Sequence, residues 1–164
     1  MLIFGIVIYA SSIILANYLV SLFGPSITPI NAFVFIGLDL ALRNFLNLQM
    51  NKWQMGAMIF GTGLISYALN DTMQIIAIAS AVSFTLASLV DWLVFNKIKG
   101  AWFKRASISN TAGALVDSIA FPTIAFGVLM PEIVILQFLA KTFGGMMWSF
   151  MLKKYVSKIQ ILAQ

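Results

Sequence analysis

The stretch that decides the fold is ISNTAGALVDSIAFPTIAFGVLMPEIVILQFLAKTFGGMMWSFML, residues 108–152. Pro131 divides it into two apolar segments, each about long enough to cross a bilayer as a helix. Each segment holds one ion near its middle, Asp117 in the first and Lys141 in the second. Because a helix rises about 1.5 Å per residue, both ions lie roughly 14 Å from an end of their segment, near the bilayer midplane. The stretch therefore predicts two antiparallel transmembrane helices whose ions can pair.

The rest of the chain has a similar character. Of its 164 residues, 61% are hydrophobic and 9% are charged, whereas a soluble domain has about 45–50% and about 25%. A soluble domain of this size could not bury so much apolar surface. We therefore expect an all-α integral membrane protein in which residues 1–164 form a single domain of six transmembrane helices. The expected spans are about 2–23, 30–46, 55–69, 73–95, 108–130 and 132–152.

The residue types that are missing restrict the chemistry. The sequence has no cysteine and no histidine, which excludes disulfides, metals bound by these residues and catalytic triads with a histidine base. It also has no G-x-x-x-x-G-K-[ST] motif for binding ATP. We therefore expect neither an enzyme nor a protein with a metal or organic cofactor. Energy for transport would come from a partner subunit, an ion gradient or metabolic trapping.

The positions of the basic residues predict the orientation. Nine of the ten lysines and arginines fall in or beside the second-to-third connection, the fourth-to-fifth connection and the C-terminal tail. The connections expected on the other side carry Asp71 and Glu132 and no basic residue. Positive residues accumulate on the cytoplasmic side of membrane proteins. We therefore expect a multi-pass protein of the cell (inner, cytoplasmic) membrane with both termini in the cytoplasm.

Polar residues inside the spans are the candidates for a binding site, because ions in lipid are costly and commonly functional. Asn110, Asp117 and Phe121 share one face of the fifth span, and Gln137 and Lys141 share one face of the sixth. Hydrogen-bonding groups combined with an aromatic suit a flat polar heterocycle better than a bare ion. The alternative is an Asp117–Lys141 ion pair that only fixes the register of the two helices.

The first two spans add further candidates. Asn31, Asp39 and Arg43 follow a slowly drifting stripe of the second span, and Asn17 lies toward the outer end of the first. Asp39 and Arg43 can pair at i, i+4, and we expect the Arg43 side chain to extend to the inner membrane surface. The predicted substrate-binding residues are therefore Asn17, Asn31, Asp39, Asn110, Asp117, Phe121, Gln137 and Lys141.

Several stretches resemble a known family. TPINAFVFIGLDLALRNFL, residues 28–46, is similar to the second span of the queuosine precursor transporters, also called the vitamin uptake transporter (VUT) family. DWLVFNKIKG at 91–100, followed by NTAGALVDSIAFPTIAFG at 110–127, resembles their fourth-to-fifth connection and fifth span. The lysine of the sixth span also fits. In that family an acidic residue often follows the arginine of the second span, whereas Asn44 stands there in this chain.

The resemblance implies a fold similar to the substrate-binding subunits of energy-coupling-factor importers. It implies a cargo that is salvaged to make queuosine in tRNA, either 7-cyano-7-deazaguanine (preQ0) or its aminomethyl analogue. A carboxylate can accept the ring N–H and exocyclic amine of such a base, and Asp117 is the expected partner. The carbonyl of the base needs a donor, such as Lys141 or Gln137. The partners would be this purine-like molecule and the lipid bilayer, with no direct contact to nucleic acid.

Other functions stay open at this point. They are an importer subunit for another vitamin-like heterocycle, a channel or lysis-type membrane protein, and a structural subunit of a larger complex. An energising partner is also open, since small residues of the first helix form the docking face in coupling-factor systems. Ser12 and Ala16 have that spacing, but such pairs are common in membrane helices, so we expect a solitary transporter.

The charge distribution generates a test of topology. A reporter fused after Gln164 is expected to be active only in the cytoplasm, because the C-terminal tail carries part of the basic cluster. Fusions with paired cytoplasmic and periplasmic reporters measure this. Activity of the periplasmic reporter at that position would contradict an even number of spans.

Overall fold

The apolar segments fold as helices. The computed structural model describes residues 2–69 and 74–162, and within these ranges every regular element is helical. The long helices lie where the sequence predicts them, with ends that differ by up to ten residues. The elements are α1 (Leu2–Phe23), the 3₁₀ turn η1 (Gly24–Ile27), α2 (Thr28–Asn31), the π-helical turn η2 (Ala32–Ile36), α3 (Gly37–Leu46), α4 (Lys52–Leu69), α5 (Gln74–Lys97), α6 (Trp102–Phe126) and α7 (Pro131–Leu162).

The helix ends differ from the expected span ends for a physical reason. Hydropathy marks the part of a helix that suits lipid, whereas backbone hydrogen bonding continues into the polar flanks. The helix of the fifth predicted span, α6, thus begins at Trp102 rather than 108, and that of the sixth, α7, continues past 152 to Leu162. Helix α6 ends at Phe126, four residues before the predicted end, because Gly127 adopts a left-handed conformation with φ of 70°.

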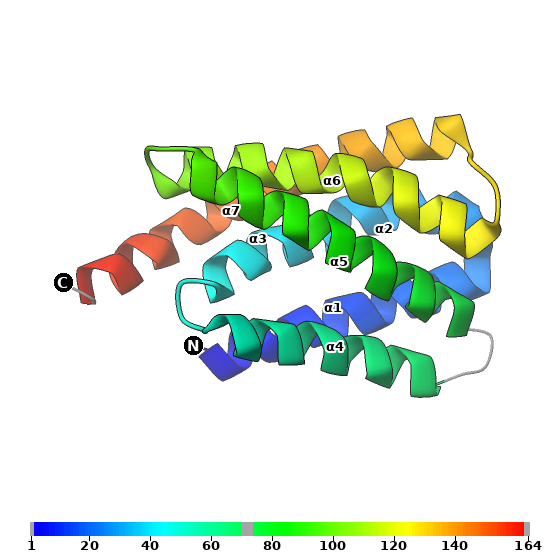
Figure 1. Cartoon of the computed structure of the whole chain (residues 1–164), viewed down its shortest axis with the longest axis horizontal. Coiled ribbons are helices and arrows are strands. Elements are labelled where there is room, and N and C mark those ends of the chain that lie inside the picture. The colour runs from blue at the N-terminus through cyan, green and yellow to red at the C-terminus, as the bar shows by residue number, and fades with distance from the viewer. Residues whose placement is uncertain (1, 70–73, 163–164) are drawn as a thin grey trace.

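Three described segments are long and apolar enough to cross a membrane: Leu2–Leu46, Gln74–Lys97 and Pro131–Ser157. The first of these holds 45 residues, but the chain reverses direction within it. Gly24 has a φ of 64° and is followed by Pro25, so α1 ends there and α3 returns beside it (Figure 1). The described part of the chain is therefore all-helical and includes segments that could cross a membrane, and the count of six spans stays a prediction.

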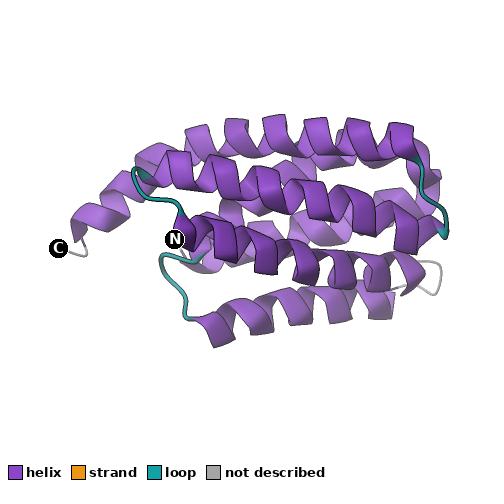
Figure 2. Ribbon diagram, turned by 45° about the horizontal axis from the view of Figure 1, so that its top comes forward, coloured by secondary structure: helices purple, strands orange, loops and turns teal. Residues whose placement is uncertain are grey.

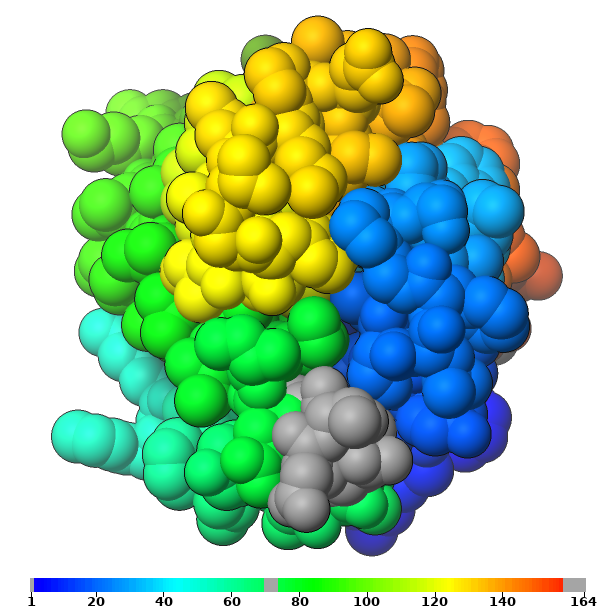
Figure 3. Space-filling model, turned by 90° about the vertical axis from the view of Figure 1, so that its right-hand side faces the viewer, coloured from blue at the N-terminus to red at the C-terminus, as the bar shows by residue number. Residues whose placement is uncertain are grey.

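The helices form a closed ring around a shared interior. Each long helix packs against the next in the order α1, α4, α5, α6, α7, α3, and α3 packs against α1 (Figures 1 and 2). The 47–51 and 98–101 connections lie at the same end of the bundle as the start of α1 and the end of α7 (Figure 1). We name this the basic end. The η1 turn and the 127–130 connection lie at the opposite end, which Figure 3 shows face on.

Two glycines allow the segment formed by α2, η2 and α3 to lie directly against α7. A Cβ atom at Gly144 would overlap the carbonyl oxygen of Phe33, and a Cβ at Gly37 would lie 2.7 Å from the carbonyl carbon of Gly144. The π-helical turn η2 lies at this contact, and its Val34 carbonyl accepts a 3.1 Å hydrogen bond from the Trp148 indole. π-Helical turns occur frequently at functional sites, and this one positions Asn31 and Ile36 toward the bundle interior.

We predict that Gly144→Ala destabilises the protein by about 1–3 kcal/mol, because the added methyl forces the backbones of η2 and α7 apart. The matched control is Gly61→Ala on α4, where nothing lies within 4 Å of the new Cβ. That change should leave stability unchanged or raise it by up to about 1 kcal/mol. Thermal unfolding of both variants in detergent measures the difference. Equal stability of the two variants would contradict the close contact.

Candidate functional site

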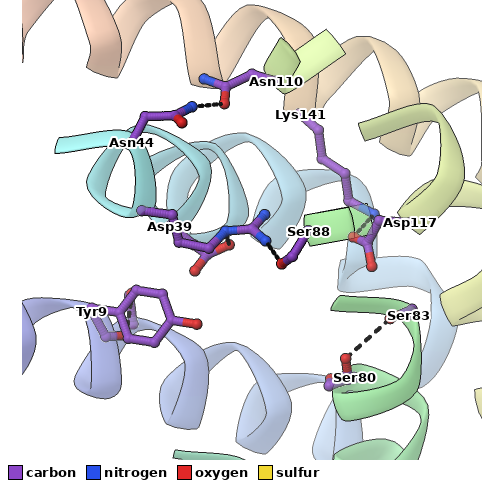
Figure 4. A network of polar contacts seen from close by, with 11 residues as sticks. Tyr9, Asp39, Asn44, Ser80, Ser83, Ser88, Asn110, Asp117 and Lys141 are labelled. Carbon is purple, nitrogen blue, oxygen red and sulfur yellow. Dashed lines mark hydrogen bonds and ion pairs between the residues drawn. The ribbon is translucent and has the colours of Figure 1, made fainter. Parts of the chain in front are cut away.

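The two midplane ions meet inside the ring. Lys141 Nζ lies 2.7 Å from Asp117 Oδ2 (Figure 4). It donates a second bond of 2.7 Å to Gln137 Oε1, one turn away on α7. The Asp117 and Lys141 residues are 3% and 1% exposed. The predicted pairing of these ions is therefore confirmed, and it is a buried pair held by helices α6 and α7.

A cavity surrounds this pair. Its walls come from α1, α2, η2, α5, α6 and α7, so every part of the ring except α3 and α4 contributes. We name it the central cavity. Its lining residues are Ala16, Asn17, Val20, Thr28, Asn31, Ala32, Ile36, Ser80, Phe84, Asp117, Phe121, Gln137 and Lys141.

Four polar atoms in the lining have no partner in the described structure. They are two hydrogen-bond acceptors, Asn31 Oδ1 and Asp117 Oδ1, and two donors, Asn17 Nδ2 and Gln137 Nε2. A buried polar group without a partner typically costs about 1–3 kcal/mol. Four such groups around one cavity are therefore expected to be met by something that enters it, either water or a polar ligand.

The orientations of the amides follow from their neighbours. A lysine ammonium can only donate, so Gln137 must turn its oxygen to Lys141, which leaves the Gln137 nitrogen free as a donor. Asn31 Nδ2 donates 3.0 Å to the backbone carbonyl of Ala16, which leaves its oxygen free as an acceptor. Asn17 Oδ1 accepts a 2.6 Å bond from Ser80. The cavity therefore offers a donor at Gln137 and an acceptor at Asn31 whose orientations are fixed by their partners.

The central cavity is narrow. Its free volume is about 30 Å³, which is the space of one or two water molecules. A heterocycle would therefore enter only if the surrounding helices move apart.

Six of the eight predicted site residues line this cavity, and two do not. The six are Asn17, Asn31, Asp117, Phe121, Gln137 and Lys141. Asn110 lies two helical turns from Asp117 along α6, or about 10.5 Å. Its side chain accepts a 2.7 Å bond from Asn44 and donates 3.3 Å to Ser149. Asn110 therefore joins helices α3, α6 and α7 and is absent from the cavity wall.

Asp39 belongs to a second ion pair on α3. Arg43 Nε lies 3.3 Å from Asp39 Oδ2, and an Arg43 guanidinium nitrogen donates to the Ser88 hydroxyl of α5 (Figure 4). Arg43 is 4% exposed, so the expectation that it extends to the membrane surface is wrong. The paired carboxylate of Asp39 and the hydroxyl of Ser88 hold it inside the ring, where its stem packs in the protein rather than in lipid.

Among the polar and aromatic lining residues, the sequence reasoning missed three: Thr28, Ser80 and Phe84. The signal for the last two is a buried stripe on α5 that includes Ala77, Ser80, Phe84, Ala87 and Asp91 at helical spacing. This stripe combines small, polar and aromatic residues, as the faces of α6 and α7 do. No comparable pattern marks Thr28, which is the first residue of the short helix α2.

Apolar helices around a cavity that holds a buried ion pair and unpaired polar groups are compatible with a membrane protein that carries solutes. Residues 4–160 match the family described as "Putative vitamin uptake transporter", and the chain belongs to this family. Comparisons with curated proteins and with solved structures found no match. The family is one of uptake transporters for vitamin-type molecules.

The small-residue pair of the first helix, which has the spacing of a docking face, faces inward. Ser12 and Ala16 are 5% and 3% exposed, and Ala16 lines the central cavity. A partner could not reach these residues while the ring is closed. Their spacing therefore reflects packing inside the bundle.

We predict that Lys141→Met lowers stability by about 3–5 kcal/mol, because it leaves Asp117 as a buried charge without its counter-ion. Adding Asp117→Asn should restore most of the loss, since no unpaired ion remains. Lys104→Met, at an exposed position of α6, is the matched control and should change stability little. Unfolding midpoints in detergent measure all three. A Lys141→Met protein as stable as the control would contradict a buried ion pair.

Proposed function

We propose that the protein imports a queuosine precursor, 7-cyano-7-deazaguanine or its aminomethyl analogue, for salvage into tRNA. The proposal includes a single domain of six transmembrane helices over residues 1–164, in the cell membrane, with both termini in the cytoplasm. The basic connections and both ends of the chain at one end of the bundle support this orientation. The proposed substrate site is the central cavity. Asp39 and Asn110 would support it from the adjacent polar layer.

The observation that carries the proposal is the set of unpaired polar atoms around the ion pair. A guanine-like edge presents a ring N–H and an amine as donors and a carbonyl as an acceptor. Asp117 Oδ1 and Asn31 Oδ1 are free to accept, and Gln137 Nε2 is free to donate. Asp117 uses its other oxygen for Lys141, so we assign the two acceptor positions to Asp117 and Asn31 rather than to Asp117 alone.

The apolar part of the cavity fits a flat ring. Phe84 of α5 and Phe121 of α6 both line it, and aromatic rings stack well on planar heterocycles. Because the cavity is narrow, with about 30 Å³ of free volume, substrate would bind after the helices separate and would be enclosed when they close. That sequence is the one expected of a carrier.

The runner-up is an importer, or importer subunit, for another vitamin-like heterocycle, because the same donors and acceptors suit several polar rings. A channel or lysis-type protein is less well supported, since the midplane ions neutralise each other in a narrow cavity instead of lining an open pore. Saturable uptake of a purine analogue separates a carrier from a channel.

The proposal predicts queuosine salvage by this chain. In a strain that lacks its own precursor synthesis and transporter, expression of the chain with added 7-cyano-7-deazaguanine should restore queuosine in tRNA. Asp117→Asn with Lys141→Met should be expressed normally and restore none at low precursor concentration. Loss of a buried charged hydrogen-bond partner typically weakens binding by about 2–5 kcal/mol, or roughly 30-fold to several-thousand-fold. Mass spectrometry of tRNA nucleosides measures the outcome.

The two ways of failing are distinct. If the unaltered chain reaches the membrane and restores no queuosine, the substrate is wrong and the runner-up gains support. If the double variant restores queuosine as well as the unaltered chain, the ion pair only sets helix register, and the cavity residues are wrongly assigned. Trp53→Ala, an exposed change on α4, controls for the effect of substitution itself.

A further inference from the structure

A second cavity lies at the basic end of the bundle, where it opens to the surface between α3, α4 and α5. It is lined by the last turns of α3, the first turn of α4 and the last turns of α5. Its free volume is about 330 Å³, roughly the lower limit for small-molecule sites. The central cavity is far smaller. We name it the basic-end cavity, and its lining residues are Arg43, Asn44, Asn47, Lys52, Met55, Ser88, Leu89, Asp91, Trp92 and Phe95.

One layer of side chains separates the two cavities. Arg43 lines the basic-end cavity, and its guanidinium lies 5.7 Å from the ring centre of Phe84, which lines the central cavity. Arg43 also donates to Ser88, one turn from Phe84 on α5. A molecule that leaves the central cavity toward the basic end would therefore pass Arg43 and enter the basic-end cavity.

Two buried polar atoms in this cavity have no partner in the described structure. Arg43 Nη2 is a free donor, and Asp91 Oδ1 is a free acceptor. The two residues are 4% and 8% exposed. The cavity therefore offers one free donor, from α3, and one free acceptor, from α5.

The positive and negative charges around the cavity nearly cancel. Arg43 is paired with Asp39, and Lys52 and Asp91 carry opposite charges. The sum is close to zero, so a phosphate or an anionic lipid headgroup would find no surplus of positive charge. The remaining wall is apolar and aromatic, and the Lys52 ammonium lies 5.3 Å from the ring centre of Trp92. Such a wall suits a neutral flat ring.

We propose that the basic-end cavity is a second binding site for a planar guanine-like base, occupied after the base leaves the central cavity. This inference rests on the proposed function for the identity of the ligand. Asp91 would accept from the base, Arg43 would donate to it, and Trp92 would stack on it. The base would thus bind at this second site on its way out of the bundle, on the side where the basic connections lie.

The test is the number of ligands bound by the purified full chain. Equilibrium dialysis with radiolabelled 7-cyano-7-deazaguanine should give two bound molecules per wild-type chain. Asp91→Asn should weaken one site by about 10- to 100-fold, because it removes a charged acceptor, and leave the other unchanged. Asp117→Asn with Lys141→Met should remove the other site and leave the first. Trp53→Ala should keep both, and size-exclusion chromatography checks that each variant is folded.

Fluorescence provides a second readout that does not depend on Asp91. Ligand that stacks on Trp92 should quench its emission in the wild type and in Trp53→Phe. The quenching should disappear in Trp92→Phe, because this variant lacks the indole on which the ligand would stack. These results would support the second site.

Two results overturn the proposal, and they can be told apart. One bound ligand that is lost only in the Asp117 and Lys141 double variant removes the second site and leaves the proposed function standing. No bound ligand in the wild type removes both the second site and the assigned substrate.

Discussion

The structure depends on keeping two opposite charges, Asp117 and Lys141, out of water in the middle of an apolar bundle. Each ion alone costs several kcal/mol to bury, and the pair is tolerable only with close contact and additional hydrogen bonds. The 2.7 Å contact and the Gln137 oxygen provide these for Lys141. Asp117 and its neighbours keep unpaired atoms on the cavity side. Unpaired atoms that lie only on the cavity side favour a ligand-binding site over a purely structural ion pair.

Some of this could be predicted from the sequence and some could not. Equal depth on consecutive helices was enough to pair Asp117 with Lys141, because antiparallel helices of similar length must bring their midpoints together. Helical spacing also placed Phe121 and Gln137 on the inner faces. It failed for Asn110, because a shared helix face extends over several turns, while a cavity occupies only one or two of them.

Arg43 shows a different limit. A long basic side chain near a helix end is expected to reach water, and only the positions of Asp39 and Ser88 show that it stays inside. Ser88 lies 45 residues away on another helix, so no local pattern reveals the contact. The π-helical turn η2 is likewise determined by close packing of Gly37 on Gly144. Tertiary contact of this kind has no local signature in composition or periodicity.

The two cavities make the basic end of the bundle different from the opposite end. The central cavity is narrow and holds the ion pair, whereas the basic-end cavity has about 330 Å³ of free volume on the other side of the Arg43 layer. A carrier needs a site that encloses its substrate and a route that opens on one side at a time. The layer of Arg43, Phe84 and Ser88 is where such a route would have to open. The basic connections place that side in the cytoplasm under the proposed orientation.

The central claim is that Asp117 and Lys141 bind substrate, and ligand-induced stabilisation tests it most directly. Thermal unfolding of the purified wild type should shift upward with 7-cyano-7-deazaguanine, by about 2.7 kcal/mol when the ligand is at 100 times its Kd. The same ligand concentration should give the Asp117→Asn, Lys141→Met protein a much smaller shift, although that protein is folded. Equal shifts in the two proteins would contradict the claim.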